Sequence, residues 1–325
     1  MTLYGKKKAL ERLSAFRREE RFPHALLFTG ERGTGKMTLA DYTAMLLLCE
    51  KNGEKPCFSC SSCIHAESHG HPDIVYVKPI LDAAKAKPGA SMTEAVRNMV
   101  KNGYLKPNDG EIRIYIFEDA ETMTTECQNA LLKFIEEPLS FNRFIFTSAA
   151  ETTILPTIRS RTVKVAVDPA TAEECEAALL EAGIKNDEAK ALSKRFSGNI
   201  GRCIQALENG DFIAELDIAV AIVAAVARKN EFEAAAAVSK LTTREIYTSV
   251  LFMLPEMLCG ALADTGEEKI DGTEAELSRK LASVFTKREL FRIAEIVEKY
   301  ITLSEFNPNI NTAANALIAE IFDVI

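Results

Sequence analysis

The sequence predicts an α/β fold with a parallel sheet, followed by a small helical part and an all-helical C-terminal part. In the first half of the 325-residue chain, short apolar runs alternate with helical stretches, which is typical of a parallel sheet with crossover helices. From residue 212 to residue 325 the chain is rich in Ala, Leu and Ile at helical spacing and has no strand-like run. A chain of this length suits two or three domains.

The expected elements follow from these runs and from the residues that interrupt them. We expect strands at residues 25–29, 73–77, 113–117, 143–147 and 162–167. Helices are expected at residues 37–48, 92–101 and 124–137, and Pro138 ends the last of these.

The composition is that of an ordinary globular protein, with 47% apolar and 26% charged residues. A net charge of −8 argues against a surface that binds nucleic acid all over, although the N-terminal helix carries a local basic run. No apolar stretch approaches the ~20 residues that cross a bilayer, and no signal-peptide pattern begins the chain. We therefore expect a cytoplasmic protein with no membrane partner.

A phosphate-binding loop follows the first expected strand. Residues 30–37 read G-E-R-G-T-G-K-M and match the pattern G-x-x-x-x-G-K-S/T up to its last position. Backbone N–H groups at a helix N-terminus attract an anion, and Lys36 adds a positive charge. Met37 replaces the hydroxyl that holds Mg²⁺, and Thr38 should point away, because one residue turns a helix by about 100°.

We therefore expect this loop to be a poor catalyst that binds ATP or ADP weakly, if at all. The loop residues expected around a nucleotide are Gly30, Gly33, Thr34, Gly35, Lys36, Met37 and Thr38.

Four of the eight cysteines form a cluster, with the spacing C-x7-C-x2-C-x2-C at Cys49, Cys57, Cys60 and Cys63. Short C-x2-C steps present two thiolates to one tetrahedral ion, and four thiolates in a reducing compartment favour a closed structural zinc site. Four unliganded thiols and an iron–sulfur cluster are the alternatives, although nothing else in the sequence indicates redox chemistry.

Two acidic residues, Glu118 and Asp119, follow the expected strand at residues 113–117 directly. Carboxylates at the C-terminal end of a central strand lie over the crevice where open α/β sheets bind ligands. A P-loop ATPase keeps one acid there for Mg²⁺ and another to orient water. The pair is weak evidence alone, because an acid after a strand is more often a helix cap, but its place after the phosphate loop favours a nucleotide site.

Several segments, taken in order, resemble the bacterial DNA polymerase III clamp-loader AAA+ subunits, and the delta-prime group in particular. They lie at residues 22–28 (F-P-H-A-L-L-F), 70–73 (G-H-P-D), 118–123 (E-D-A-E-T-M), 129–138 (N-A-L-L-K-F-I-E-E-P) and 155–161 (L-P-T-I-R-S-R). The cysteine cluster lies between the first two. The resemblance covers about residues 1–205, and beyond them mainly the helical character agrees.

The resemblance implies three domains: an AAA+ ATPase-type domain at 1–167 with a zinc module at 49–63, a helical lid at 168–209, and a helical collar for oligomerisation at 210–325. It also places Arg202, at the end of the segment S-G-N-I-G-R, at the degenerate nucleotide site. The partners that it implies are motor and delta-like loader subunits in a hetero-oligomer, the sliding clamp, and primed DNA reached through the assembly.

Departures from the family's motor pattern indicate the role. Besides Met37, Glu118 stands where the motor has Asp, and Asp119 stands where it has Glu. Because phosphoryl transfer needs strict orientation, such shifts can cost orders of magnitude in rate. Arg161 remains, and in the family this arginine reaches the neighbouring subunit's ATP in trans, as an arginine finger does.

We therefore expect a non-motor, delta-prime-like subunit that helps ATP-dependent loading of the sliding clamp onto primed DNA during replication. It would have little or no ATPase activity of its own while belonging to the DNA polymerase holoenzyme. One alternative is the ATP-hydrolysing gamma/tau-like motor of the same loader, which Met37 and the exchanged acids oppose. The other is a zinc-containing P-loop ATPase of another pathway, which the segments at 129–138 and 155–161 oppose.

Overall fold

The computed structural model describes residues 2–19, 21–51, 53, 55–86, 91–149, 151–263, 273–304, 306 and 308–325. The chain divides into two compact units. The first consists of residues Met1–Ala178 and Asn199–Gly201, and the second of Leu179–Gly198 and Arg202–Ile325. This division falls inside the helical lid expected at 168–209, and the separation of a lid from a collar stays a prediction.

The first unit contains a five-stranded parallel sheet with the order β2-β3-β4-β1-β5. The strands are β1 (Ala25–Thr29), β2 (Ile74–Tyr76), β3 (Arg113–Phe117), β4 (Asn142–Ser148) and β5 (Val163–Ala166). All five expected strands are confirmed, two of them with the expected ends and three with ends that differ by one residue. The order places β1, which leads into the phosphate loop, between β4 and β5.

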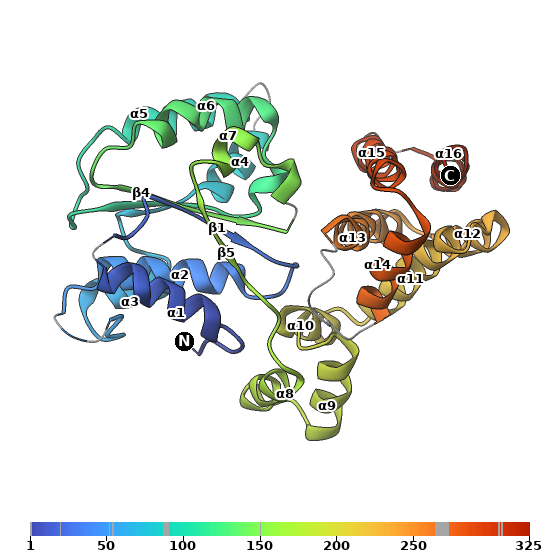
Figure 1. The fold of residues 1–325 in the computed structure, drawn as a ribbon, viewed down its shortest axis with the longest axis horizontal. Helices are drawn as coiled ribbons and strands as arrows, with labels where there is room; N and C mark the ends of the chain where they lie inside the picture. The colour runs from blue at the N-terminus through green and yellow to red at the C-terminus, as the bar shows by residue number, and fades with distance from the viewer. Residues whose placement is uncertain are drawn as a thin grey trace. The chain divides into compact units, whose positions relative to one another are not determined.

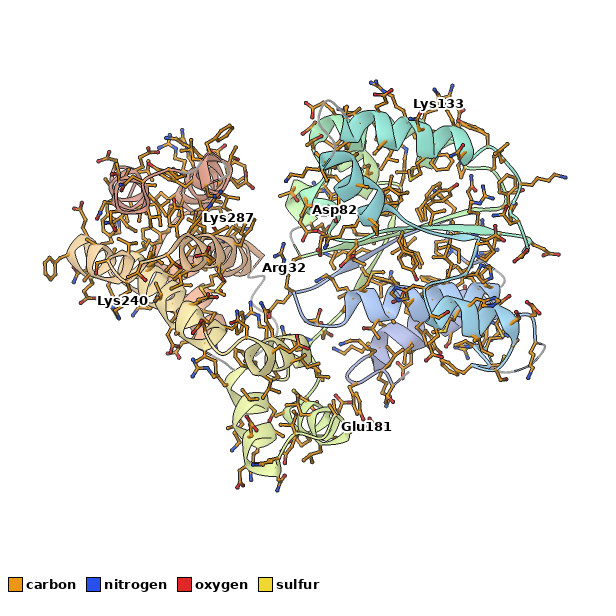
Figure 2. All side chains as sticks on the ribbon, turned by 180° about the vertical axis from the view of Figure 1, so that it is seen from behind. Arg32, Asp82, Lys133, Glu181, Lys240 and Lys287 are labelled. Carbon is orange, nitrogen blue, oxygen red and sulfur yellow. The ribbon has the colours of Figure 1, made fainter. Side chains whose placement is uncertain are left out.

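Helices cover both faces of this sheet (Figure 1). One face carries α1 (Lys7–Arg18), α2 (Lys36–Leu48) and α3 (Ser61–Glu67), and the other carries α4 (Val77–Lys85), α5 (Met92–Asn102), α6 (Thr125–Glu136) and α7 (Pro156–Arg159). Two short 3₁₀ turns, η1 (Ala120–Thr122) and η2 (Glu151–Thr153), follow the ends of β3 and β4. The exposed Asp82 on α4 and Lys133 on α6 lie on outer surfaces of this unit (Figure 2).

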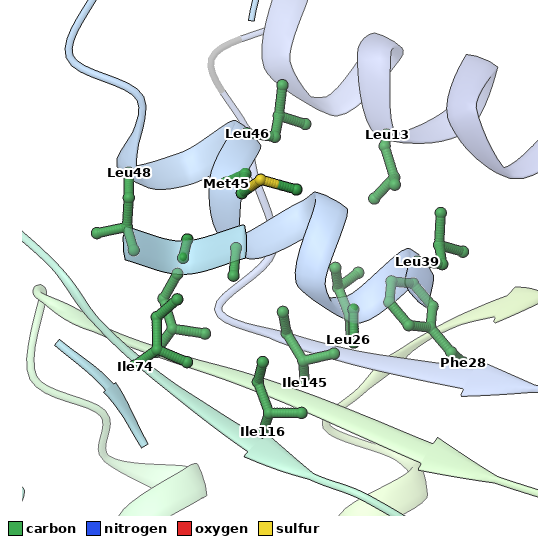
Figure 3. Close-up of a cluster of buried hydrophobic side chains, with 14 of the residues drawn as sticks. Leu13, Leu26, Phe28, Leu39, Met45, Leu46, Leu48, Ile74, Ile116 and Ile145 are labelled. Atoms are coloured by element: carbon green, nitrogen blue, oxygen red, sulfur yellow. The ribbon is translucent and has the colours of Figure 1, made fainter. Parts of the chain in front are cut away.

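The two faces are buried because successive strand residues point to opposite sides. Leu26, Phe28, Ile116 and Ile145 pack against α1 and α2 (Figure 3). The residues between them on the same strands pack against α4, α5 and α6; they are Ala25, Leu27, Tyr115, Phe117, Phe144 and Phe146. Because both faces are apolar, the strands read as continuous apolar runs, as expected for a buried parallel sheet.

The remaining helices follow β5, and no strand lies between them in the described parts of the chain, as expected from the sequence. They are α8 (Ala172–Glu181), α9 (Asn186–Arg195), α10 (Ile200–Glu208), α11 (Phe212–Ala227), α12 (Glu231–Val238), α13 (Arg244–Ala263), α14 (Thr273–Val284), α15 (Lys287–Ser304) and α16 (Ile310–Phe322). Helix α13 packs against α11, α14 and α15, and α12 packs against α16. Across the described ranges, no helix combines the length and apolar composition that a membrane span requires.

Candidate nucleotide and metal sites

The phosphate loop is closed around its own lysine. Gly35 is the N-cap of α2 with φ of +80°, in the left-handed region that favours glycine. The Lys36 side chain that follows is buried, and its Nζ donates to the carbonyl oxygens of Gly30 at 2.8 Å and Glu31 at 2.7 Å. The Lys36 ammonium is therefore hydrogen-bonded to the backbone of the loop and stabilises its closed shape.

Three residues of the loop decide whether a hydroxyl group is available to a metal ion, and their surroundings differ. Thr34 is buried and donates its hydroxyl to the carbonyl of Glu31 at 2.8 Å, so it closes the turn. Met37, in the first turn of α2, packs against the apolar core under β1 and leaves no oxygen there for a metal ion. Thr38 Oγ1 lies 3.9 Å from where a Cβ on Gly35 would be, beside the start of the helix.

Residues 199–201, which belong to the first unit, lie directly on the phosphate loop. Asn199 donates its side-chain N–H to the carbonyl of Arg32 at 2.7 Å, and the Gly201 N–H donates to the carbonyl of Gly33 at 3.0 Å. A Cβ on Gly201 would lie 2.4 Å from Gly33 Cα, so only glycine allows this approach. Arg202, the next residue, is buried on α10 in the second unit, and its role at the nucleotide site stays a prediction.

The two acids after β3 share one lysine. Lys78, near the start of α4, has its Nζ 3.3 Å from Glu118 Oε1 and 2.8 Å from Asp119 Oδ2. Asp119 has φ of +46°, and its N–H donates to Thr147 Oγ1 at the end of β4 at 3.0 Å. This contact helps to fix the unusual backbone that presents the Asp119 carboxylate to Lys78.

A second polar cluster joins the helix after the phosphate loop to β2. Tyr76 donates its hydroxyl to Asp41 Oδ1 at 2.9 Å, and His69 Nε2 lies 3.3 Å from Asp41 Oδ2. The His69 ring stacks on Tyr76 with centroids 4.8 Å apart. Burial raises the pKa of Asp41, and the contacts with Tyr76 and His69 partly oppose this. The loop that follows the cysteine cluster is thus tied to the helix that carries Lys36.

The four clustered cysteines converge on one point, with all four Sγ atoms within 4.8 Å of one another. The Cys57 and Cys63 sulfurs are 4.0 Å apart. Tetrahedral Zn–S bonds of about 2.3 Å would separate the sulfurs by about 3.8 Å, so the donor set fits a four-thiolate metal site with small adjustments. The cluster can hold a metal ion, as expected from the spacing.

The thiols differ in acidity, which a shared metal ion would change. Hydrogen bonds from Ser59 and Cys60 lower the pKa of the Cys57 thiol to about 5. Burial and the neighbouring sulfurs raise the pKa of the Cys63 thiol to about 12. Four adjacent thiolates repel one another, and a bound dication offsets that repulsion as the thiols lose their protons.

Arg161 lies after α7 at the start of the turn into β5, and its side chain is 38% exposed. One guanidinium nitrogen is 2.9 Å from Glu136 Oε1, and another donates to the carbonyl of Thr157 at 2.9 Å. Within this chain, the arginine is thus paired with an acid at the C-terminal end of α6.

The sequence did not single out Lys78 or the Asp41 cluster, and it placed Lys6 only in the basic run near the N-terminus, as part of a solvated helix face or a DNA contact. Lys6 is buried, donates its Nζ to the carbonyl of Asp168 at 2.6 Å, and would have its Cε 3.5 Å from a Cβ on Gly35. In the sequence, Lys78 is marked only by its place after β2. That strand is the neighbour of β3, which is followed by the two acids. That signal needs the strand order, which the sequence does not display.

The match to a known protein family falls within the first unit. A family model described as DNA polymerase III, delta subunit, matches residues 5–171. The delta-prime subunit of Bacillus subtilis is 29% identical over 195 residues, which are 60% of this chain and 56% of that protein. That of Haemophilus influenzae is 31% identical over 138 residues, 42% of this chain and 40% of that protein. The gamma/tau subunit of Mycobacterium tuberculosis is 37% identical over 143 residues, 44% of this chain and 24% of that protein.

The chain thus matches little more than half the length of the Bacillus subtilis relative and less of the other two. The family model covers about half of the chain and contains the phosphate loop, the cysteine cluster, both acids and Arg161. The expected resemblance to a clamp-loader subunit of the delta-prime kind is therefore confirmed, and the chain belongs to the DNA polymerase III delta-subunit family.

Proposed function

We propose that this chain is a non-motor subunit of a bacterial clamp loader, which helps to load the sliding clamp onto primed DNA beside motor and delta-like subunits in the cytoplasm. The observation that carries the proposal is the altered catalytic site. Met37, which stands where a motor needs a hydroxyl for Mg²⁺, is partly buried and packs against the core. Both acids of the second motif contact Lys78. Such a site suits an interaction component of an ATPase machine more than its motor.

The motor alternative draws support from the gamma/tau relative, which is more identical than either delta-prime relative over its shorter match. It requires Mg²⁺ at the phosphate loop, and Met37 offers that ion no ligand. A P-loop ATPase of another pathway fits less well, because the family model covers the whole sheet of the first unit.

ATP turnover by the isolated chain separates these functions. We expect no metal-dependent turnover near the motor scale of about 1 s⁻¹. Turnover at that rate, abolished by Lys36→Ala, would identify a motor and refute the proposal. Reconstitution with candidate loader subunits should give a complex of defined mass, and a chain that joins no such complex would be excluded as a loader subunit.

We also propose that the metal held by the cysteine cluster is a structural zinc ion. Four thiolates fill a tetrahedral shell and leave no open position for a substrate. Cys63 and Cys60 are buried among residues of the core between α2 and α3, so the ion would join α3 to the rest of the first unit. The metal content of the purified chain tests this proposal.

Arg161 is proposed to act in trans on the ATP of a neighbouring subunit. Its contact with Glu136 supports this, because a 38% exposed guanidinium held by one carboxylate can exchange that partner for a phosphate. Arg159, which lies two residues earlier in α7, provides the control substitution. Arg159→Ala should leave the assembly's ATP turnover unchanged if only Arg161 reaches the neighbour.

A further inference from the structure

Lys78 owes its position to the register of the sheet. Strands β2 and β3 are parallel, and Tyr76 pairs with Ile116. Two residues further along each strand direction stand Lys78 and Glu118, at the edge where the C-terminal ends of the strands meet. The resulting contacts, 3.3 Å to Glu118 and 2.8 Å to Asp119, reach both acids with one ammonium.

This ammonium stays charged at physiological pH. Burial alone would lower the pKa of Lys78, but the hydrogen bond to Asp119 and the charges of Asp119 and Glu118 raise it above the ordinary lysine value. In a magnesium-dependent site the dication offsets such acids. Here the chain itself supplies the positive charge.

The phosphate loop carries two more ammonium groups. Lys36 lies inside the loop, and Lys6 lies beside Gly35, close enough to Lys36 that their charges interact. Asp168 and Glu174 offset the charge of Lys6, and Asp41 is buried and accepts from Tyr76 beside His69. Because Lys78 pairs with both Glu118 and Asp119, these acids repel a polyanion less than they would without it. Lys36 is then the cation of the loop that attracts a polyanion without a dication.

We propose that Lys78 is a built-in counter-ion that takes the place of a divalent cation at Glu118 and Asp119, so that the phosphate loop binds a nucleoside polyphosphate without magnesium. The proposal deepens the proposed function and rests on it in taking the loop as a nucleotide site. It makes two separate demands: the acids bind no free dication, and the loop needs none to bind nucleotide.

The first demand is tested with Mn²⁺ alone, which prefers oxygen ligands to the thiolates of the cysteine cluster. Mn²⁺ binding to the full chain is followed by electron paramagnetic resonance. We expect Lys78→Met to tighten Mn²⁺ binding at least about tenfold over wild type, because an ammonium within about 4 Å repels a dication even in water. Lys78→Arg, which keeps the charge, should bind Mn²⁺ as weakly as wild type.

Equal Mn²⁺ affinity in wild type, Lys78→Met and Lys78→Arg would overturn the counter-ion role. Far-UV circular dichroism checks that each variant folds, and Lys78→Gln replaces Lys78→Met if the latter does not. Because no nucleotide is present, this result is independent of whether the chain is a motor.

The second demand is tested with a fluorescent ATP analogue, titrated in buffer freed of divalent cations and in Mg²⁺. Wild type should bind with affinities that agree within about twofold in the two buffers, whereas Lys78→Met should bind more weakly in the cation-free buffer and recover in Mg²⁺. Binding that requires Mg²⁺ in wild type, or no binding in either buffer, would overturn the magnesium-free site. ATP turnover by the wild-type chain would instead refute the non-motor function, so the two failures are distinguishable.

Discussion

Replacing Asp73 perturbs a buried carboxylate that holds one end of the sheet together. Its Oδ1 accepts from the Asn108 N–H at 2.6 Å, and its Oδ2 accepts from the N–H groups of Asp109 at 2.8 Å and Gly110 at 2.9 Å. Arg113, also buried, lies 3.6 Å from Oδ1. Asp73 is 0% exposed, so water cannot replace these contacts in the variant.

The expected cost follows from what the substitution leaves behind. Asp73→Ala leaves three backbone N–H groups without an acceptor and removes the counter-ion of Arg113. Removing one partner of a buried ion pair lowers the free energy of unfolding by about 3–5 kcal/mol. Arg113 keeps its contacts with backbone carbonyls, including that of Lys106 at 2.8 Å. We therefore expect the lower part of that range, about 3 kcal/mol, for Asp73→Ala. Asp73→Asn keeps one acceptor oxygen and should cost about 2 kcal/mol.

Urea unfolding, followed by far-UV circular dichroism, measures these free energies. Asp82→Ala is the matched control, because Asp82 is exposed on α4 (Figure 2) and should change the free energy of unfolding by no more than about 0.5 kcal/mol. If Asp73→Ala costs less than about 1 kcal/mol, the carboxylate does not hold the loop and the reasoning is wrong.

The same substitution has a defined pH dependence. Burial alone would raise the pKa of Asp73, but the three backbone N–H groups and Arg113 lower it below the ordinary value. A carboxyl group whose folded pKa is depressed stabilises the protein fully above the unfolded value of about 3.9 and loses that effect as the pH falls through the folded value. The difference between wild type and Asp73→Asn should thus shrink below about pH 4, and a difference that grows there would contradict the assignment.

Three further outcomes are expected. Elemental analysis should find one zinc ion per chain, and the double variant Cys60→Ser, Cys63→Ser should lose it; zinc retained in that variant would exclude the cluster. Arg161→Ala should preserve assembly but partly reduce clamp-stimulated ATP turnover, and loading at the wild-type rate would exclude a trans role. Gly201→Ala places a Cβ 2.4 Å from the phosphate loop's backbone and should lower the melting temperature, whereas Gly210→Ala, with open space around it, should not.

The strands and the phosphate loop could be predicted because their signals are local. Each strand is a short apolar run, and the loop has a fixed spacing of glycines before a lysine. Helix α4 was not predicted, because it begins at Val77, directly after β2, without a side-chain cap and with Pro79 in its first turn. The expected strand at 73–77 was therefore one residue too long at each end. The Asp73 carboxylate binds the loop at 108–110, while its backbone carbonyl accepts from the Ile114 N–H.

The counter-ion at the acids could not be predicted in this way, because Lys78 and Glu118 are brought together only by the pairing of β2 with β3. Under the proposed function, Met37 and Lys78 nevertheless bear on the same charge balance. A loop without the metal-binding hydroxyl offers Mg²⁺ one ligand fewer, and two adjacent carboxylates without a cation repel each other. The Lys78 ammonium, 2.8 Å from Asp119 and 3.3 Å from Glu118, offsets part of that repulsion, so the lysine does at these acids what a dication does in a motor.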